Sequence, residues 1–298
     1  MRTTSSCINS WWAEGRDRRH NADKNSNKPY FRRVLKAVKE KIPVHHFIVV
    51  DGYSTDGTVE AVKEFFGSRV KVIRTAGTLG YARLLGLLAS DTEWVAFVDS
   101  DVEILDGYDV AEPLMRNMRV WGIQGVFVDE TAKALRSNKD IEIVYDIGLA
   151  NVKILLKYGF YNFFGADTGY VYLRRRVVEI IHPRVLSQLD SGEDLYMAQE
   201  IVQKGLLYIR FKRLRAHHYG GSKTRLEWKK LVRRAFNPHG LAYYLNSGAL
   251  FGWAVARLAS AFWRRDLGAI LIIIVTLLGL PAAKKKLDKT LEGFEVLT

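Results

Sequence analysis

Short apolar runs alternate with amphipathic segments along most of the chain. Short, mainly apolar runs predict strands over residues 47–50, 70–73, 94–98, 170–173 and 206–211. The continuous apolar run 47–50 is typical of a strand buried on both faces. Apolar positions recurring every three or four residues predict helices over about 29–41, 79–89, 109–118 and 140–157, and further helices that begin near 58 and 191. Strands that alternate with helices predict a parallel α/β sheet with right-handed crossovers.

Some segments are predicted from local signals alone. Asn27 is expected to cap the first helix, with Pro29 in its first turn. Asp56 is expected to cap the helix near 58. The stretch VWGIQGVFV, residues 120–128, predicts a pair of strands, and residues 215–221 predict a loop.

Two carboxylates follow the apolar run 94–98 directly. Residues two apart in an extended chain point to the same face, so Asp99 and Asp101 can lie side by side at a strand end. Hard oxygen ligands of this kind suit Mg²⁺ or Mn²⁺, which bridges to substrate phosphates. The pattern therefore predicts a metal site for a phosphate-bearing substrate. The alternative is a polar turn in which Asp99 only caps the segment that follows.

A third acid ends another predicted strand. Asp51 follows the run 47–50 and opens the turn DGYSTDGT. In parallel α/β sheets, ligands gather at the carboxyl ends of the strands. We therefore expect Asp51 and Asp99 to lie on the same edge of the sheet.

Composition and charge narrow the class of partner. The chain has 298 residues, of which 48% are hydrophobic, enough for one large or two ordinary domains. Its net charge of +13 indicates an anionic partner: nucleic acid, acidic lipid or a phosphorylated substrate. Cys7 is the only cysteine, which excludes an intrachain disulfide and a cysteine zinc site. The N-terminal residues contain no apolar signal region.

The C-terminal part indicates membrane attachment. Residues 267–283 carry no charge and lie between the basic groups 264–266 and 284–286. Such a stretch is at the short end of what spans a bilayer; a shallow hairpin or interfacial helix would keep both basic flanks near anionic headgroups. A buried core helix is the alternative. The basic segments 174–176 and 223–234 could meet lipid phosphates, or could be solvated basic faces.

Motifs in a fixed order give a resemblance to a known family. IVVDGYSTDGT, LGYARLLG, FVDSD, GEDLYMAQEIVQKG and HHYGG follow one another along the chain. Over roughly residues 30–225 this sequence resembles the family 2 glycosyltransferases. The resemblance implies the GT-A fold, a Rossmann-like mixed sheet flanked by helices, over residues 29–235. A divergent segment, 1–28, would precede it, and an apolar helical membrane-associated region, 236–298, would follow it.

The resemblance assigns donor and metal roles. Asp51 would bind the base or ribose of a UDP- or GDP-linked sugar, although it could merely begin a turn. Arg83 would contact the diphosphate or hold an acid of the site, unless it is a solvated helix-face arginine. Asp101 would be the main metal ligand, with His218, or less readily His217, completing the site. Asp99 would reach the ribose, or the metal through water, and Ser100 is grouped with the donor-binding residues.

The resemblance also implies the chemistry. Asp194, with Glu193 beside it, matches the family's catalytic base, which would take a proton from the acceptor hydroxyl in a single inverting displacement. Alternatively Asp194 only serves the start of its helix, where anions are favoured. The expected acceptor is a lipid phosphate or a lipid-linked glycan, with the catalytic domain on the cytoplasmic side of a membrane. The Gln-x-x-Arg-Trp pattern of processive synthases is absent, which favours transfer of one sugar.

One departure from the family leaves a second function open. Family members usually begin with an apolar strand, and CINSWWAEG shows none, so the first strand is either highly divergent or lost. A lost strand would favour a non-catalytic, membrane-bound protein built on a decayed transferase domain. Nucleic-acid binding is not expected, because no recognised nucleic-acid module occurs in the sequence.

Overall fold

The computed structural model describes residues 6–8, 27–128, 140–144, 169–189 and 193–219, together with isolated positions between 258 and 285. The strands are β1 (Ser6–Ile8), β2 (Val44–Asp51), β3 (Val70–Arg74), β4 (Trp94–Val98), β5 (Val102–Ile104), β6 (Val120–Phe127), β7 (Ile141–Val144), β8 (Tyr170–Arg174) and β9 (Leu207–His218). The helices are α1 (Phe31–Lys41), α2 (Thr58–Phe66), α3 (Leu79–Ala89), α4 (Tyr108–Met115), α7 (Pro183–Ser187) and α8 (Glu193–Gln203), with 3₁₀ turns at Gly67–Arg69 and Arg175–Glu179.

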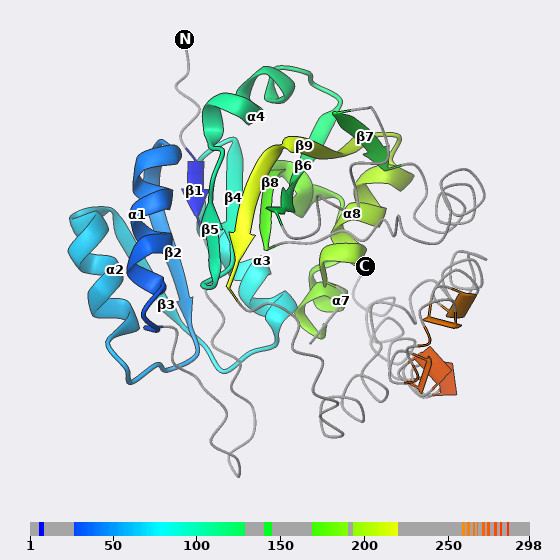
Figure 1. The fold of residues 1–298 in the computed structure, drawn as a ribbon, viewed down its shortest axis with the longest axis horizontal. Helices are drawn as coiled ribbons and strands as arrows, with labels where there is room; N and C mark the ends of the chain where they lie inside the picture. The colour runs from blue at the N-terminus through cyan, green and yellow to red at the C-terminus, as the bar shows by residue number, and fades with distance from the viewer. Residues whose placement is uncertain are drawn as a thin grey trace, which may run out of the picture.

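All the described strands form one sheet (Figure 1). It has nine strands in the order β3-β2-β1-β4-β8-β6-β9-β5, and β7 pairs with β9. The pairs among β3, β2, β1 and β4 are parallel, as the alternation of strands and helices predicts. Beyond β4 the direction changes, because β8 runs antiparallel to both β4 and β6. The sheet is therefore mixed.

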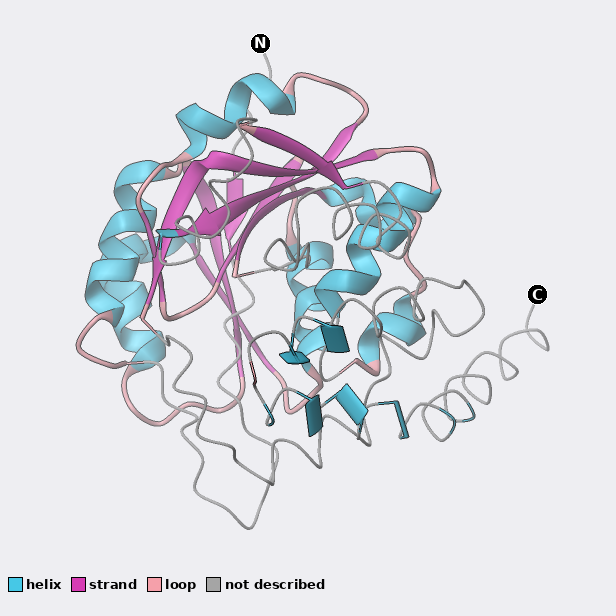
Figure 2. Ribbon diagram, turned by 45° about the vertical axis from the view of Figure 1, so that its right-hand side comes forward, coloured by secondary structure: helices cyan, strands magenta, loops and turns pink. Residues whose placement is uncertain are grey.

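Helices cover both faces of this sheet (Figure 2). Side chains along β4 alternate between the faces: Trp94, Ala96 and Val98 pack with residues of α1, α2 and α4, whereas Val95 and Phe97 pack with residues of α3, α7 and α8. This period of two is the geometry of an extended strand. Each face of the sheet thus has its own apolar core, and β4 contributes to both.

The first strand is divergent rather than lost. Ser6–Ile8 lies between β2 and β4 and pairs in parallel with both. A strand of three residues is too short to give a continuous apolar run, so the sequence pattern missed it. The central position of the sheet is filled, and the observation that motivated a decayed transferase domain is removed.

Two other sequence predictions are wrong. Residues 120–128 do not form a pair of strands, because β6 is continuous over 120–127 and pairs with β8 on one side and β9 on the other. The predicted loop at 215–221 is strand as far as His218, since β5 pairs with this end of β9. In both cases the pairing partners come from distant parts of the sequence.

The helix predicted over 140–157 is not observed where the structure describes it. Residues 141–144 form β7, an edge strand that pairs antiparallel with β9. The remaining residues of that prediction, 145–157, lie outside the described part. Apolar residues at 141, 143 and 144 fit a short strand as well as one turn of helix. The spacing of apolar residues alone therefore could not distinguish a strand from a helix here.

Asn27 does not cap the first helix. Its backbone N–H donates to Asp56 Oδ2 at 2.7 Å and its side-chain amide donates to the Asp56 carbonyl at 2.9 Å. Helix α1 begins at Phe31, whose N–H donates to the Lys28 carbonyl. The N-cap of α2 is Gly57, not Asp56 as predicted, but Asp56 lies just before it and its Oδ1 accepts from the Thr58 N–H at 3.1 Å.

Arg174 is neither a lipid contact nor part of a solvated basic face. It is only 3% exposed, pairs with Glu93, and donates to the carbonyls of Val120 and Met115 at 2.8 and 3.0 Å. Its guanidinium lies 4.7 Å from the centre of the Trp94 ring. Arg174 therefore ties β8 to β6 and to the end of α4.

Replacement of Arg174 by leucine is expected to lower the free energy of unfolding by about 2 kcal/mol, because buried carbonyls lose their charged donor. Arg176→Leu is the matched control, since the Arg176–Glu179 pair is exposed at the surface and should contribute nothing measurable. Chemical denaturation of both variants checks this. Equal midpoints for the two variants would contradict a structural role for Arg174.

The predicted C-terminal membrane region falls mostly outside the described residues. Among the residues that the structure does describe, no helix is both long enough and apolar enough to cross a bilayer. The predicted domain boundaries, 28/29 and 235/236, stay predictions.

Candidate functional site

The carboxyl ends of three parallel strands share one edge of the sheet. Asp51 is the last residue of β2, Asp99 comes directly after β4, and β1 lies between these two strands. Two interstrand spacings separate the ends of β2 and β4 by about 10 Å. The two acids predicted to share an edge therefore do so, at the site expected for ligands of a parallel α/β sheet.

The Asp51 carboxylate is held by the turn that follows it. Its side chain is only 2% exposed, and its oxygens accept from the Ser54 N–H at 3.0 and 3.3 Å. Arg74 Nε lies 3.7 Å from Asp51 Oδ2. Arg74 was not among the predicted residues, although it ends β3, the strand beside β2, and a cation at that position is a signal that could have been used.

Arg83 is buried at the centre of an acidic cluster. Its Nη2 donates to Asp99 Oδ1 at 2.8 Å and its Nε lies 4.0 Å from Glu193 Oε1. The guanidinium also lies 5.2 Å from the centre of the Phe97 ring. The side chain is 2% exposed, so the solvated helix-face alternative is wrong.

Neighbouring acids keep Arg83 positively charged despite its burial. Burial lowers the pKa of Arg83, but the negative charges of Asp99, Glu193 and Asp194 more than offset this, and the pKa is raised above its ordinary value. Arg83 is thus a permanent cation that faces acids from two distant segments. It brings the strand end at Asp99 and the first turn of α8 to one place.

Helix α3 is fixed at its N-terminus, which positions Arg83. Thr78 caps the helix by accepting from the Tyr81 N–H at 3.0 Å, and its hydroxyl donates to the Ser187 carbonyl at 2.5 Å. The Gly80 N–H donates to the Leu189 carbonyl at 2.8 Å. A Cβ added at Gly80 would lie 2.0 Å from the Leu186 carbonyl oxygen. Only glycine permits this close approach of the two backbones.

Replacing Gly80 with alanine is expected to push α3 away from α7 and to lower the free energy of unfolding by about 1–3 kcal/mol. Gly67→Ala is a useful comparison, because a Cβ there would meet nothing within 4 Å, although its positive φ adds backbone strain. Thermal denaturation of the two variants gives the measurement. A Gly80 variant as stable as the native chain would show that α3 can shift at little cost.

Asp101 faces His218. The distance between Asp101 Oδ2 and His218 Nε2 is 3.2 Å, and the His218 ring stacks on Phe127 with 5.0 Å between ring centres. The neighbouring His217 instead packs edge-on against Tyr219. The strand geometry of β9 explains the difference, since successive side chains point to opposite faces. Of the two histidines, His218 is the one placed beside Asp101.

These side chains could supply part of a metal site. A carboxylate oxygen and an imidazole nitrogen, on Asp101 and His218, lie close enough together to bind one ion. Asp99 accepts from Arg83, and Ser100 lies in the turn between the two acids. Within the described ranges, the one group of three potential ligands within reach of a common ion is elsewhere, at His45, His46 and Asp91.

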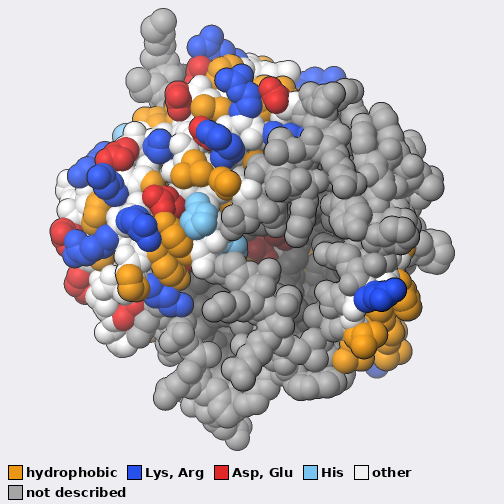
Figure 3. Space-filling model, viewed as in Figure 1, with side chains coloured by type: hydrophobic (Ala, Val, Ile, Leu, Met, Phe, Trp, Pro, Cys, Tyr) orange, Lys and Arg blue, Asp and Glu red, His pale blue; other side chains and the backbone are white. Residues whose placement is uncertain are grey.

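The predicted site residues are thus linked in two groups along one edge. Arg83 contacts Asp99 and Glu193, and the charge of Asp194 acts on it as well. Asp101, which pairs with His218, follows two residues after Asp99. Asp51 shares the edge without touching either group. On the face of the molecule drawn in Figure 3, the described basic side chains are dispersed among acidic ones.

Comparison with solved structures identifies the fold. A mannosyltransferase from Pyrobaculum calidifontis, solved with GDP-Man and Mn²⁺, superposes with a TM-score of 0.57 at 16% identity, over 99% of this chain and 81% of that one. A mycobacterial protein superposes with a TM-score of 0.51 at 14% identity, over 81% and 74% of the two chains. At such identities the likeness concerns the fold, which is α/β with a mixed, GT-A-like sheet. A comparison with curated proteins finds no match.

Sequence comparison gives the family. The family described as glycosyl transferase family 2 matches residues 21–179, more than half of the chain. The match spans Asp51, Arg83, Asp99 and Asp101, the residues of the shared sheet edge. The chain belongs to glycosyl transferase family 2 and is a glycosyltransferase.

Proposed function

We propose that this glycosyltransferase moves one sugar from a UDP- or GDP-linked donor to a lipid-phosphate or lipid-linked glycan acceptor, with inversion and with Mg²⁺ or Mn²⁺ as cofactor. One observation carries the proposal. Asp51 and Asp99 end neighbouring parts of one sheet edge, and beside them Arg83 contacts Asp99 and Glu193 while His218 contacts Asp101.

The donor would lie along this edge from Asp51 to Asp101. Asp51, held by the Ser54 N–H, presents carboxylate oxygens to the N–H groups of a base or the hydroxyls of a ribose. Asp99 and Ser100 lie two strands further on, where the ribose and the diphosphate would follow. The P. calidifontis mannosyltransferase was solved with GDP-Man and Mn²⁺, which supports a donor of the same class here.

Asp101 and His218 would hold the metal ion. Their 3.2 Å separation and their O and N donor atoms fit Mn²⁺ or Mg²⁺ completed by phosphate oxygens and water. When bound, such an ion supplies positive charge beside the diphosphate leaving group. The chain contributes its own positive charge through Arg83, which orients Asp99 by a 2.8 Å hydrogen bond.

The first turn of α8 would provide the base. Glu193 is 3% exposed and faces Arg83, so it is suited to holding that arginine. Asp194 is less buried and is the better placed of the two to meet an acceptor from solvent. A carboxylate at this point can take a proton from an attacking hydroxyl while the sugar carbon develops positive charge, which gives inversion in one displacement. A phosphate acceptor is already ionised and needs no base, so Asp194 would then only position it.

The composition of the chain supports the proposed lipid acceptor and the proposed location at a membrane. The surplus of basic residues and the uncharged stretch 267–283 between basic flanks support attachment to an anionic membrane, with the catalytic domain on its cytoplasmic side. No nucleic acid is expected as a partner, since the sequence contains no recognised nucleic-acid module.

A thermal-shift screen tests the donor proposal. UDP- and GDP-sugars are offered with and without Mn²⁺, and free sugars and nucleosides serve as controls. A ligand bound by the native state raises the melting temperature; at a hundred times its Kd the stabilisation is about 2.7 kcal/mol. We expect one donor class to stabilise the protein only when Mn²⁺ is present. Stabilisation by no nucleotide sugar, or equal stabilisation by nucleosides, would contradict the proposal.

A further inference from the structure

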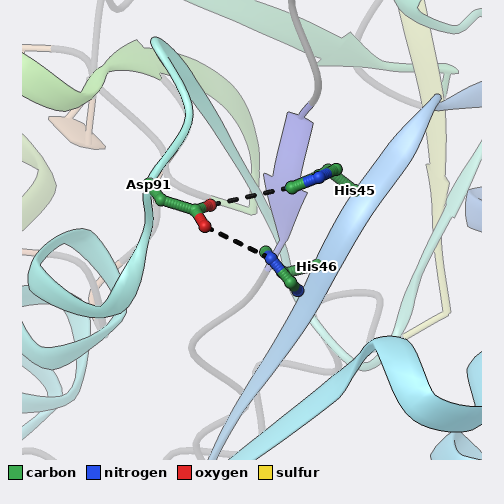
Figure 4. A group of neighbouring side chains, drawn as sticks. All are labelled: His45, His46 and Asp91. Carbon is green, nitrogen blue, oxygen red and sulfur yellow. Dashed lines mark ion pairs between the residues drawn. The ribbon is translucent and has the colours of Figure 1, made fainter.

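Two adjacent histidines and an aspartate meet at the opposite end of the sheet from the transferase site (Figure 4). His46 Nε2 lies 3.2 Å from Asp91 Oδ2, and His45 Nδ1 lies 3.7 Å from Asp91 Oδ1. One ligand atom from each of the three residues lies within 4.8 Å of the others. His45 is six residues before Asp51 on the same strand, so the cluster is about 20 Å from the donor edge.

A β-bulge makes this arrangement possible. Adjacent residues of a regular strand point to opposite faces, so His45 and His46 would not normally reach one carboxylate. Along β2, however, Ser6 pairs with Val44 while Cys7 pairs with His46, which inserts His45 as an extra residue. Bulges re-aim side chains. Here both imidazole rings turn towards Asp91, with 4.3 Å between their centres.

The spacing fits a zinc ion. Tetrahedral zinc with N and O ligands at about 2.0–2.2 Å has ligand atoms about 3.3–3.5 Å apart. The two nitrogen–oxygen distances, 3.2 and 3.7 Å, lie close to that range but run to different oxygens of Asp91. The three ligand atoms lie within 4.8 Å of one another, so a bound ion would draw them slightly closer together. Two imidazoles and one carboxylate are a ligand set used by zinc sites that keep a fourth position open.

The charges around the cluster act on a cation in opposite directions. Asp91 supplies the one carboxylate among the three ligands. Lys71 Nζ lies 3.8 Å from Asp91 Oδ2, the oxygen that also faces His46. Lys71 therefore competes with a metal ion for this carboxylate.

We propose that His45, His46 and Asp91 form a second cation site, which binds Zn²⁺ and is separate from the transferase site. Asp91 precedes β4 and the histidines begin β2, the two strands that flank β1. A zinc ion would join these strands across the end of the three-residue β1. Its role is to stabilise the central part of the sheet.

Calorimetric titration of ZnCl₂ into the full chain, prepared without a histidine tag, tests this site. The native chain should bind one Zn²⁺ here, and His46→Gln and Asp91→Asn should each weaken that binding by at least about tenfold. Asp101→Asn is the control and should keep it, because Asp101 lies at the other end of the sheet. Lys71→Met should bind more tightly than the native chain, since the competing charge is removed.

Melting curves in EDTA and in Zn²⁺ provide a second readout. The side chains of His46 and Asp91 are 25% and 54% exposed, so the variants should fold. Zinc should raise the melting temperature of the native chain and of Asp101→Asn, but not that of His46→Gln. If His46→Gln binds zinc as tightly as the native chain, or the native chain shows no saturable binding, the proposed site does not exist.

Discussion

Asp101→Asn is expected to reduce donor turnover by about 10²–10³-fold, the usual effect of removing one group that stabilises developing charge in an active site. The carboxylate of Asp101 faces His218 at 3.2 Å and would be the main protein ligand of the metal. Turnover is measured as Mn²⁺-dependent hydrolysis of the donor identified by the thermal-shift screen, which needs no acceptor.

The fold should survive this substitution. Asp101 is only partly buried and its backbone carbonyl, which accepts from the Tyr219 N–H at 2.8 Å, is unchanged. Glu103→Gln is a matched control, since Glu103 lies two residues further along and pairs with the Tyr219 hydroxyl instead. If both variants lose the same activity, the effect belongs to the β5 segment as a whole and not to a metal ligand.

Arg83→Leu is expected to lower the free energy of unfolding by about 3–5 kcal/mol, because removing one partner of a buried ion pair leaves the other uncompensated. Here Asp99 and Glu193 both lose their cation, and Glu193 is itself buried. Donor turnover should fall as well, since Asp99 is no longer oriented by the 2.8 Å hydrogen bond. Urea denaturation gives the stability, and turnover is compared under conditions where the variant is folded.

Two further variants make the Arg83 prediction specific. Asp99→Asn in the Arg83→Leu background should recover part of the lost stability, because it removes one uncompensated charge. Lys36→Leu, a change of an exposed basic residue on α1, should leave stability nearly unaltered. An Arg83→Leu chain within about 1 kcal/mol of the native stability would mean that the cluster is hydrated and does not depend on the arginine.

The sequence predicted the central elements because their signals are local. Thr78 caps α3, and the apolar run at 94–98 is a fully buried strand, so both elements match their predicted residues. It missed β1 and β5, each of three residues, and it mistook β7 for helix. These strands form because distant strands pair with them, and a short stretch of sequence does not identify the pairing strand.

The site residues divide in the same way, into those that local signals place together and those that only the packing of distant segments brings together. Asp51 and Asp99 were predicted together, because strand ends in a parallel sheet share an edge whatever the details of packing. The contact between Arg83 and Glu193 joins residues more than a hundred positions apart, and only the docking of α3 against α7 and α8 produces it. The cluster of His45, His46 and Asp91 depends on a bulge between β1 and β2, which the residue pattern gave no means of locating.

Electron paramagnetic resonance of Mn²⁺ tests the central claim most directly, because it counts the ion bound beside Asp101. The titration is done with the nucleoside diphosphate of the preferred donor, in a His46→Gln background that excludes the second cation site. We predict one bound Mn²⁺ per chain that requires both the nucleotide and Asp101, so that it disappears in Asp101→Asn. Mn²⁺ binding that is equal with and without Asp101 would contradict the account of this edge as the donor and metal site.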